Sequence, residues 1–98
     1  MEFQKFVFKT EFAKYYFSDY EEPEDFKKID KMIRKNKRLK VKVLEYLDGF
    51  SFLMKKYSIF GGEIYLYNEH MTGNYLTIKK KEDEEALEMV IDELKSVE

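Results

Sequence analysis

Two stretches of the chain repeat apolar residues at the spacing of an amphipathic helix. The first spans 23–36, where apolar residues recur every three or four positions at Phe26, Ile29, Met32 and Ile33. The second spans 82–98 behind Asp83 as a capping residue, and its apolar stripe consists of Leu87, Val90, Ile91 and Leu94. Because each predicted helix has a single apolar stripe, each needs another surface to cover.

Between these helices, three two-residue turn signals divide the chain into segments of strand length. Each signal supplies the positive φ that tight hairpin turns need. The signals are Asp48-Gly49, Gly61-Gly62 and Gly73-Asn74. They predict four strands, over 39–47, 50–60, 63–72 and 75–81. A helix that ends at Gly49 is an alternative for the first strand, but the alternation of the β-branched Val41 and Val43 favours a strand.

The N-terminal segment completes the predicted fold. FVFKTEF alternates as a strand does, so we predict a strand over 3–10, followed by a short helix or turn over 11–18. The fold class is α+β, a single domain over 1–98 with an antiparallel four- to five-strand meander sheet and two helices packed on one face. This order, β-α-β-β-β-β-α, resembles a single repeat of the TATA-binding-protein fold by fold analogy alone, which implies no function.

The turn signals also predict which side chains share a face, because a two-residue turn sets the register between strands. The predicted pairs are Leu47 with Phe50, Phe60 with Glu63 and Thr72 with Tyr75. The predicted core face consists of Leu39, Val41, Val43, Leu47, Phe50, Phe52, Met54, Phe60, Tyr65, Tyr67, Met71, Leu76 and Ile78. The opposite, outer face carries lysines and polar residues together with eight apolar or aromatic side chains: Leu44, Tyr46, Leu53, Tyr57, Ile59, Ile64, Leu66 and Tyr75.

These eight side chains are the predicted protein interface. Two helices can cover only one face of the sheet, so the other face would expose apolar surface on the scale of an interaction site. Three covers are compatible with the sequence: the segment 11–20 folding back, a second copy of the chain, or a different protein. Tyrosine and phenylalanine anchors ringed by lysine are typical of an interface core with a polar rim.

The sequence offers little reactive chemistry. It has no Cys and a single His, so we predict no catalytic, cofactor-binding or metal-binding residues. His70 lies on the predicted outer face without a Ser or Cys to activate, and we interpret it as a polar strand residue. Glu45, Glu63 and Glu69 fall on the predicted core face, where ion pairs with lysine are favoured over a carboxylate pair for acid–base catalysis.

Positive charge is concentrated in residues 27–42, where Asp30 is the single acid. This stretch could neutralise the phosphates of a nucleic acid while Tyr46, Tyr57 and Tyr75 stack on its bases. A solvated helix face is the simpler interpretation, and the net charge of −2 weighs against nucleic acid. The residues of this alternative site are Lys27, Lys31, Arg34, Lys35, Lys37, Arg38, Lys40 and Lys42.

The remaining features define the expected class of protein. The chain lacks a membrane-spanning run and a signal peptide, so we expect a cytoplasmic protein. Its excess of Lys and Glu is typical of thermophile proteins, although an A+T-rich genome gives the same bias. We predict a small non-enzymatic regulator or inhibitor, with the size and skewed composition that fit a viral type, that contacts another protein or forms a homodimer through its outer face. A nucleic-acid-binding protein is the second hypothesis, and an enzyme is the third.

Overall fold

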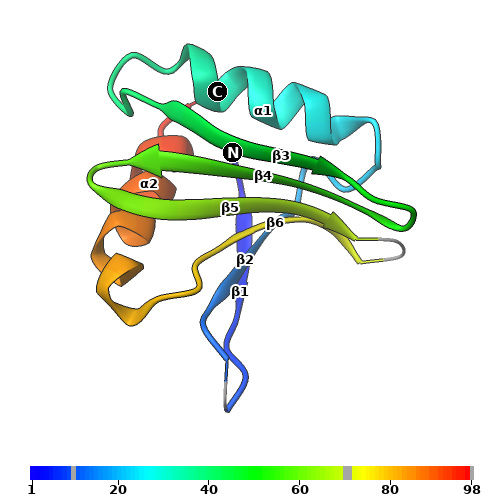
Figure 1. Cartoon of the computed structure of the whole chain (residues 1–98), viewed down its shortest axis with the longest axis horizontal. Helices are drawn as coiled ribbons and strands as arrows, with labels where there is room; N and C mark the ends of the chain where they lie inside the picture. The colour runs from blue at the N-terminus through cyan, green and yellow to red at the C-terminus, as the bar shows by residue number, and fades with distance from the viewer. Residues whose placement is uncertain (10, 70–71, 98) are drawn as a thin grey trace.

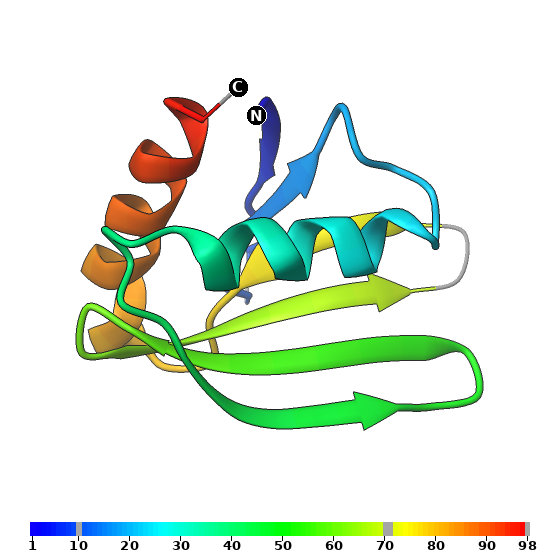
Figure 2. The ribbon, with the colours of Figure 1, turned by 90° about the horizontal axis from the view of Figure 1, so that it is seen from above.

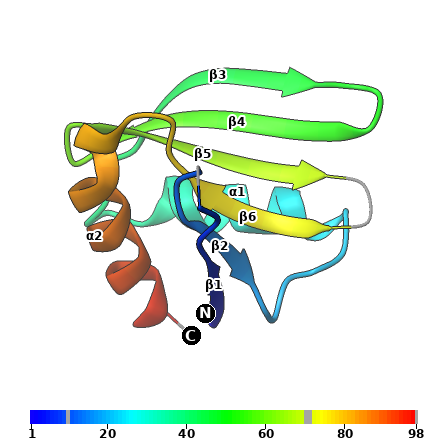
Figure 3. The ribbon, with the colours of Figure 1, turned by 90° about the horizontal axis from the view of Figure 1, so that it is seen from below.

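The structure is a computed structural model that describes residues 1–9, 11–69 and 72–97 as a six-stranded antiparallel sheet with two helices (Figure 1). The strands are β1 (Phe3–Phe6), β2 (Lys14–Phe17), β3 (Lys42–Asp48), β4 (Phe52–Ile59), β5 (Gly62–Glu69) and β6 (Gly73–Thr77). The helices are α1 (Asp25–Lys35) and α2 (Glu84–Lys95), and a short 3₁₀ turn, η1 (Lys81–Asp83), precedes α2. The strand order is β1-β2-β6-β5-β4-β3, so β1 and β3 form the two edges (Figure 3).

The α+β class with an antiparallel sheet and two helices is confirmed, but the strand count is wrong. The segment 11–18, predicted as a short helix or turn, contains β2, which pairs with β1 on one side and with β6 on the other. In β2, Tyr15 and Phe17 are buried while Tyr16 is partly exposed, so the period of two outweighs the helical spacing. This extra strand also removes the element order on which the analogy to the TATA-binding-protein fold rested.

One apolar core joins both helices to the same side of the sheet. The predicted stripes are confirmed on both helices, except that Met32 is only partly buried. Figure 2 shows α1 and α2 running in different directions against the sheet, so that together they cover strands from its centre to its N-terminal edge. The sheet contributes to this core Tyr15, Phe17, Tyr57, Ile59, Ile64, Leu66, Leu76 and Ile78.

The face that the helices cover on β4 and β5 is the opposite of the predicted one. Tyr57 and Leu66 lie under the helices, whereas Phe52 and Tyr67 face away from them. The prediction of which side chains of β4 and β5 share a face was nevertheless right. Ile59 pairs with Gly62, whereas the predicted pair was Phe60 with Glu63, and this shift of the register by an even number of residues keeps every side chain with the same companions. The prediction therefore separated the two faces of this hairpin correctly and chose the wrong one as the core.

Strand β6 has the opposite parity to the prediction. Tyr67 pairs with Tyr75, and Leu66 pairs with Leu76, which is an odd offset from the predicted pairing of Thr72 with Tyr75. An odd offset moves every side chain of a strand to the other face. Leu76 therefore lies on the helix side, and Tyr75 lies on the open side of the sheet.

The edge strand β3 is exposed along its whole length, which corrects several predicted core positions. A β-bulge shifts its register between Val43 and Glu45, and the helices do not cover this edge. The strand begins only at Lys42 because Lys40 has a φ of 50°, a left-handed conformation that ends the preceding turn. Predicted core residues that are exposed are Val43, Leu47, Phe50, Phe52 and Phe60. Those that are buried are Leu39, Met54, Tyr65, Leu76 and Ile78, while Met71 lies outside the described residues.

A buried carboxylate ties α1 to β4. Asp30 accepts hydrogen bonds from Arg34 Nε at 2.9 Å, from Lys55 Nζ at 2.8 Å and from the Tyr57 hydroxyl at 2.6 Å. Burial disfavours the charged carboxylate, but these three donors outweigh it and hold the pKa of Asp30 below its ordinary value of 3.8. Burial, reinforced by the charge of Asp30, raises the pKa of Tyr57, so its hydroxyl remains a donor.

We expect Asp30→Asn to lower the free energy of unfolding at pH 7 by roughly 2 kcal/mol, because three donors lose a shared charge. Since the folded-state pKa of Asp30 lies below the unfolded one, its contribution is present above pH 3.8 and is lost as the pH falls through the folded-state value. Urea unfolding should therefore show a difference between the two proteins that shrinks on acidification. The control Asp92→Asn, an exposed aspartate on α2, should change the free energy by less than about 0.5 kcal/mol. A difference that does not depend on pH would contradict this role.

Candidate functional site

The eight side chains predicted as a protein interface do not form a surface. Four of them are at most 1% exposed beneath the helices: Tyr57, Ile59, Ile64 and Leu66. Leu53 is partly buried, and Tyr75 is 2% exposed on the other side of the sheet. Only Leu44 and Tyr46, on the edge strand β3, are substantially exposed, at 42% and 48%. The prediction that these residues share one exposed outer face is therefore wrong.

The open side of the sheet instead carries a row of five aromatic rings, which we call the aromatic row: Phe6, Tyr16, Tyr75, Tyr67 and Tyr65. The register places it, because Tyr16 and Tyr67 both pair with Tyr75 from its two neighbouring strands. The ring centroids of Tyr16 and Tyr75 are 4.9 Å apart, and those of Tyr67 and Tyr75 are 5.4 Å apart. Such cross-strand aromatic pairs stabilise a sheet beyond their buried area.

Lysine side chains cover much of this row. The Nζ atom of Lys14 lies 5.1 Å from the ring centroid of Tyr75, and that of Lys79 lies 4.6 Å from the centroid of Tyr65. These are cation–π contacts. The neighbouring Tyr67 hydroxyl raises the pKa of Lys79, which favours the charged form of this lysine. The open side therefore presents ammonium groups rather than bare rings, and Tyr65 is only 7% exposed.

The acceptor for the central tyrosine is a carboxylate. The Tyr75 hydroxyl donates to Glu69, and burial together with this carboxylate raises the pKa of Tyr75. Glu63 lies on the same side of the sheet and pairs with Lys56 at 3.4 Å and with Lys80 at 3.5 Å. Burial disfavours the charge of Glu63, but the two lysines lower its pKa below the ordinary value. The preference for lysine ion pairs over a carboxylate pair thus holds for Glu63, whereas Glu69 is held by a tyrosine.

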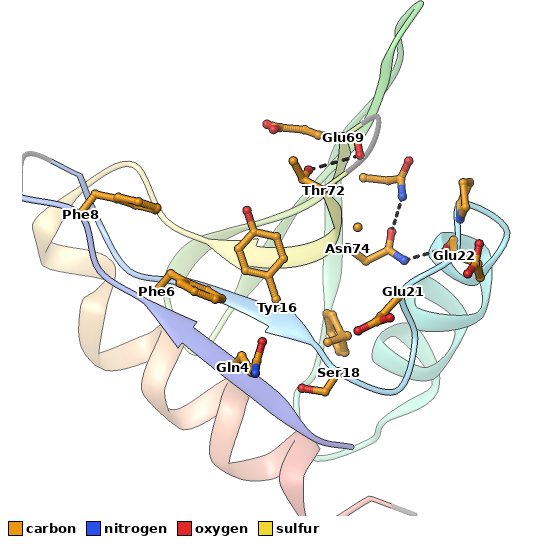
Figure 4. A pocket seen from close by; sticks show the side chains of 14 residues that line it. Gln4, Phe6, Phe8, Tyr16, Ser18, Glu21, Glu22, Glu69, Thr72 and Asn74 are labelled. Atoms are coloured by element: carbon orange, nitrogen blue, oxygen red, sulfur yellow. Dashed lines mark hydrogen bonds between the residues drawn. The ribbon is translucent and has the colours of Figure 1, made fainter.

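A cleft of about 760 Å³ opens where the aromatic row meets the loop between β2 and α1 (Figure 4). We call it the aromatic cleft. Phe6, Phe8 and Tyr16 form one wall, and Glu21 of the loop lies across from them (Figure 4). Its volume falls within the range of roughly 300–1,000 Å³ that is typical of ligand sites. The lining that the structure describes contains three carboxylates and no Lys or Arg: Glu21, Glu22 and Glu69.

Asn74 holds the loop that forms this wall. Its side-chain amide donates to the backbone carbonyls of Tyr20 at 2.9 Å and of Glu22 at 3.0 Å, and its carbonyl accepts from Asn68 at 2.9 Å. Asn74 is 1% exposed, the bond with Asn68 is buried, and the two bonds to the loop carbonyls are partly buried. The preceding Gly73 has a φ of 90°, a conformation that favours glycine. The sequence predicts a hairpin turn at the Gly73-Asn74 pair, but this pair begins β6, and Asn74 anchors the loop.

The cleft was not predicted from the sequence, because the segment 11–18 was expected to form a short helix or turn rather than a strand. Phe8 and Tyr16 become neighbours of β6 only when β2 pairs with it. The available signal was the alternation in KYYF, in which Tyr15 and Phe17, on either side of Tyr16, are the buried residues. Segment 11–20 was one of three proposed covers for an outer face, and the structure places its strand within the sheet instead.

The residues of the alternative nucleic-acid site are all exposed, but the tyrosines chosen to accompany them are not beside them. Lys27, Lys31, Arg34 and Lys35 are on α1, and the other four lie between α1 and the start of β3. Two of the eight already have acidic partners, since Arg34 contacts Asp30 and Arg38 contacts Glu93. Tyr57 is buried, and Tyr75 faces away from α1. Only Tyr46 is exposed near α1, with its ring stacked 6.5 Å from that of Phe26.

Other candidate chemistry is sparse in the part of the chain that the structure describes. No group of three or more potential metal ligands occurs among those residues, and no helix there is long and apolar enough to span a membrane. His70 lies outside the described residues, so its interpretation as a polar strand residue stays a prediction. Comparisons with protein-family models, curated proteins and solved structures found no match.

We expect Asn74→Ala to lower the free energy of unfolding by about 2–3 kcal/mol, because two partly buried loop carbonyls and the buried Asn68 amide lose their hydrogen-bond partner. Amide hydrogen exchange should accelerate in residues 18–22 more than in β4, since the loop loses its anchor. Thr72→Ala is the control: within the described part of the chain, the hydroxyl of this exposed residue donates to the backbone carbonyl of Glu69 alone. Unchanged exchange in the loop of the Asn74 variant would show that the loop is held by other contacts.

Proposed function

We propose that the protein is a small non-enzymatic binding protein, of regulator or inhibitor type, that acts through protein–protein contacts. The aromatic cleft receives a segment of the partner protein. The observation that supports this proposal is the wall of aromatic side chains beside three carboxylates. Phe6 is 43% exposed and Phe8 is 51% exposed, and because both line the same cleft they form an exposed apolar cluster rather than scattered surface residues.

The chemistry of the cleft favours a partner segment that combines an apolar or aromatic side chain with a lysine or arginine. Aromatic residues in a concave site are the usual centres of binding energy in protein interfaces. The carboxylates of Glu21, Glu22 and Glu69 complement positive charge, and opposite charges at the rim of an interface raise the association rate and the specificity.

The same residues give little support to an enzyme. The aliphatic hydroxyls that line the cleft belong to Ser18 and Thr72, and no histidine is found among the described lining residues to act as their base. Glu69 accepts a hydrogen bond from the Tyr75 hydroxyl, so this carboxylate already has a structural partner. We do not propose the homodimer that the sequence predicts through the outer face, because the central residues of the predicted outer face are buried.

A peptide-display selection tests this proposal and does not require a known partner. A displayed library of random 12-residue peptides would be panned on the wild-type protein and counter-selected on Phe8→Glu. Enriched peptides should share an aromatic or aliphatic residue with a Lys or Arg nearby. Their binding should fall at least about tenfold in Phe8→Glu, since a charge enters the apolar wall.

Met89→Glu is the matched control, because Met89 is 44% exposed and lies on α2, outside the residues that line the cleft. It should bind the selected peptides as the wild type does. Binding that is lost equally in both variants, or a selection that enriches acidic peptides, would contradict the proposal. NMR shift changes confined to α1 or β3 would do the same.

Nucleic-acid binding is the second candidate, and it is supported by the exposure of all eight basic residues between Lys27 and Lys42. It requires retention on single-stranded DNA or RNA at low salt and a steep loss of affinity as salt increases. The double variant Lys31→Glu with Lys35→Glu should then abolish retention, whereas Phe8→Glu should leave it intact. Absence of retention at low salt would eliminate this candidate.

A further inference from the structure

The aromatic row has cations over its rings at one end and not at the other. The three rings on β5 and β6 each have a lysine Nζ atom between 4.6 Å and 5.8 Å from their centroid. The two remaining rings, Phe6 of β1 and Tyr16 of β2, line the aromatic cleft. No lysine or arginine of the described residues lies over either of them, so the rings at the cleft lack the partner that the other rings have.

The carboxylates of the cleft also lack a basic partner. Glu21, Glu22 and Glu69 line the cleft, and none of them belongs to an ion pair between residues that the structure describes. Glu69 accepts a hydrogen bond from the Tyr75 hydroxyl, which supplies no positive charge. Both the two rings and the carboxylates are therefore complementary to a cation from outside the chain.

Gly73 brings these carboxylates to the same end of the cleft. It pairs with Glu69 across β5 and β6, and a Cβ atom at Gly73 would lie 3.5 Å from the backbone carbonyl oxygen of Glu21. The loop that carries Glu21 therefore passes close to the start of β6, and the hydrogen bonds from Asn74 hold it there. The arrangement exists in the chain alone, so a ligand does not have to assemble it.

We infer that the cation is the guanidinium group of an arginine in the partner segment, an inference that rests on the function proposed for the cleft. A guanidinium is flat and weakly hydrated, stacks on aromatic rings, and directs its N–H donors outward in its own plane. The rings of Phe6 and Tyr16 are nearly perpendicular, at 89°, with centroids 5.3 Å apart. A flat group can stack on one ring while its edge meets the other ring, and its donors then extend toward the carboxylates at the rim.

Other cations use less of this site. A lysine ammonium is compact and strongly hydrated, and it cannot stack on a ring and pair with a carboxylate through two parallel hydrogen bonds. A trimethylated lysine binds aromatic rings well but has no N–H donor for the carboxylates. Phe8 is the third aromatic residue of the wall, and the Nζ atom of Lys14 lies 5.8 Å from its ring centroid. Phe8 therefore contacts the apolar part of the partner segment, and the arginine binds at Phe6 and Tyr16.

A competition between matched peptide libraries tests the inference with the full chain. Three displayed libraries of 12-residue peptides carry Arg, Lys or Gln at one fixed central position and exclude Arg and Lys everywhere else. They are panned together in equal amounts on the wild-type protein. The Arg library should be recovered at least about fivefold more often than either of the others, because Lys keeps the charge without the flat shape and Gln loses the charge.

Variants of the cleft test where the arginine binds. Phe6→Leu removes a ring but keeps an apolar side chain, and Glu21→Gln removes a carboxylate from the rim. Each should weaken binding of a recovered Arg peptide by at least about threefold and reduce its advantage over the same peptide made with Lys. Glu24→Gln is the matched control, because Glu24 is also exposed and close in sequence but does not line the cleft. It should bind as the wild type does.

The outcomes separate this inference from the function on which it rests. Equal recovery of the Arg library and of the Lys or Gln library would overturn the inference, although peptides would still bind the cleft as proposed. Tighter binding of the same peptide made with trimethyl-lysine would also overturn it, and so would an unchanged preference for Arg in both Phe6→Leu and Glu21→Gln. Failure of every library to yield a peptide whose binding depends on Phe8 would contradict the proposed function, and the inference with it.

Discussion

The structure depends on the register between β5 and β6. Pairing of Leu66 with Leu76 aligns aliphatic side chains beneath both helices, and the same register pairs Tyr67 with Tyr75 on the open side. A shift of one residue would place Tyr75 under the helices and expose Leu76 to water, and both changes would lower the stability of the fold. The core, the aromatic row and the anchoring of the cleft loop through Asn74 all follow from this one alignment.

The two sides of the sheet use different physics. The helix side is an apolar layer of aliphatic and aromatic side chains that contains an ionic cluster, in which Asp30 is neutralised by Lys55 and Arg34. The open side consists of tyrosine rings whose faces are occupied by lysine ammonium groups and whose hydroxyls are partly satisfied by carboxylates. Tyr65 and Tyr75 are therefore buried although no described helix covers this side. Exposed apolar side chains remain mainly at the aromatic cleft and along the edge strand β3.

Much of the fold was predictable from the sequence, and the failures have identifiable causes. The two helices and the β4–β5 hairpin follow from periodicity and turn chemistry, which act locally. The choice of the core face was wrong although the sequence contained a signal against it: Glu45, Glu63 and Glu69 all fell on the chosen face, and buried carboxylates are costly. Strand β2 and the cleft were missed because the alternation in KYYF is only four residues long, and part of the pairing that stabilises this strand comes from β6, which is distant in sequence.

The pairing of β2 with β6 also bears on how the chain assembles. Tyr15 and Leu76 are neighbours in the sheet but are separated by about sixty residues along the chain, whereas the other strand pairs join segments that are adjacent or nearly so. During synthesis, the β1–β2 hairpin leaves the ribosome long before its docking strand exists, and its apolar residues must wait in solution. We therefore expect the docking of the hairpin onto the meander to be the most entropically demanding step of folding.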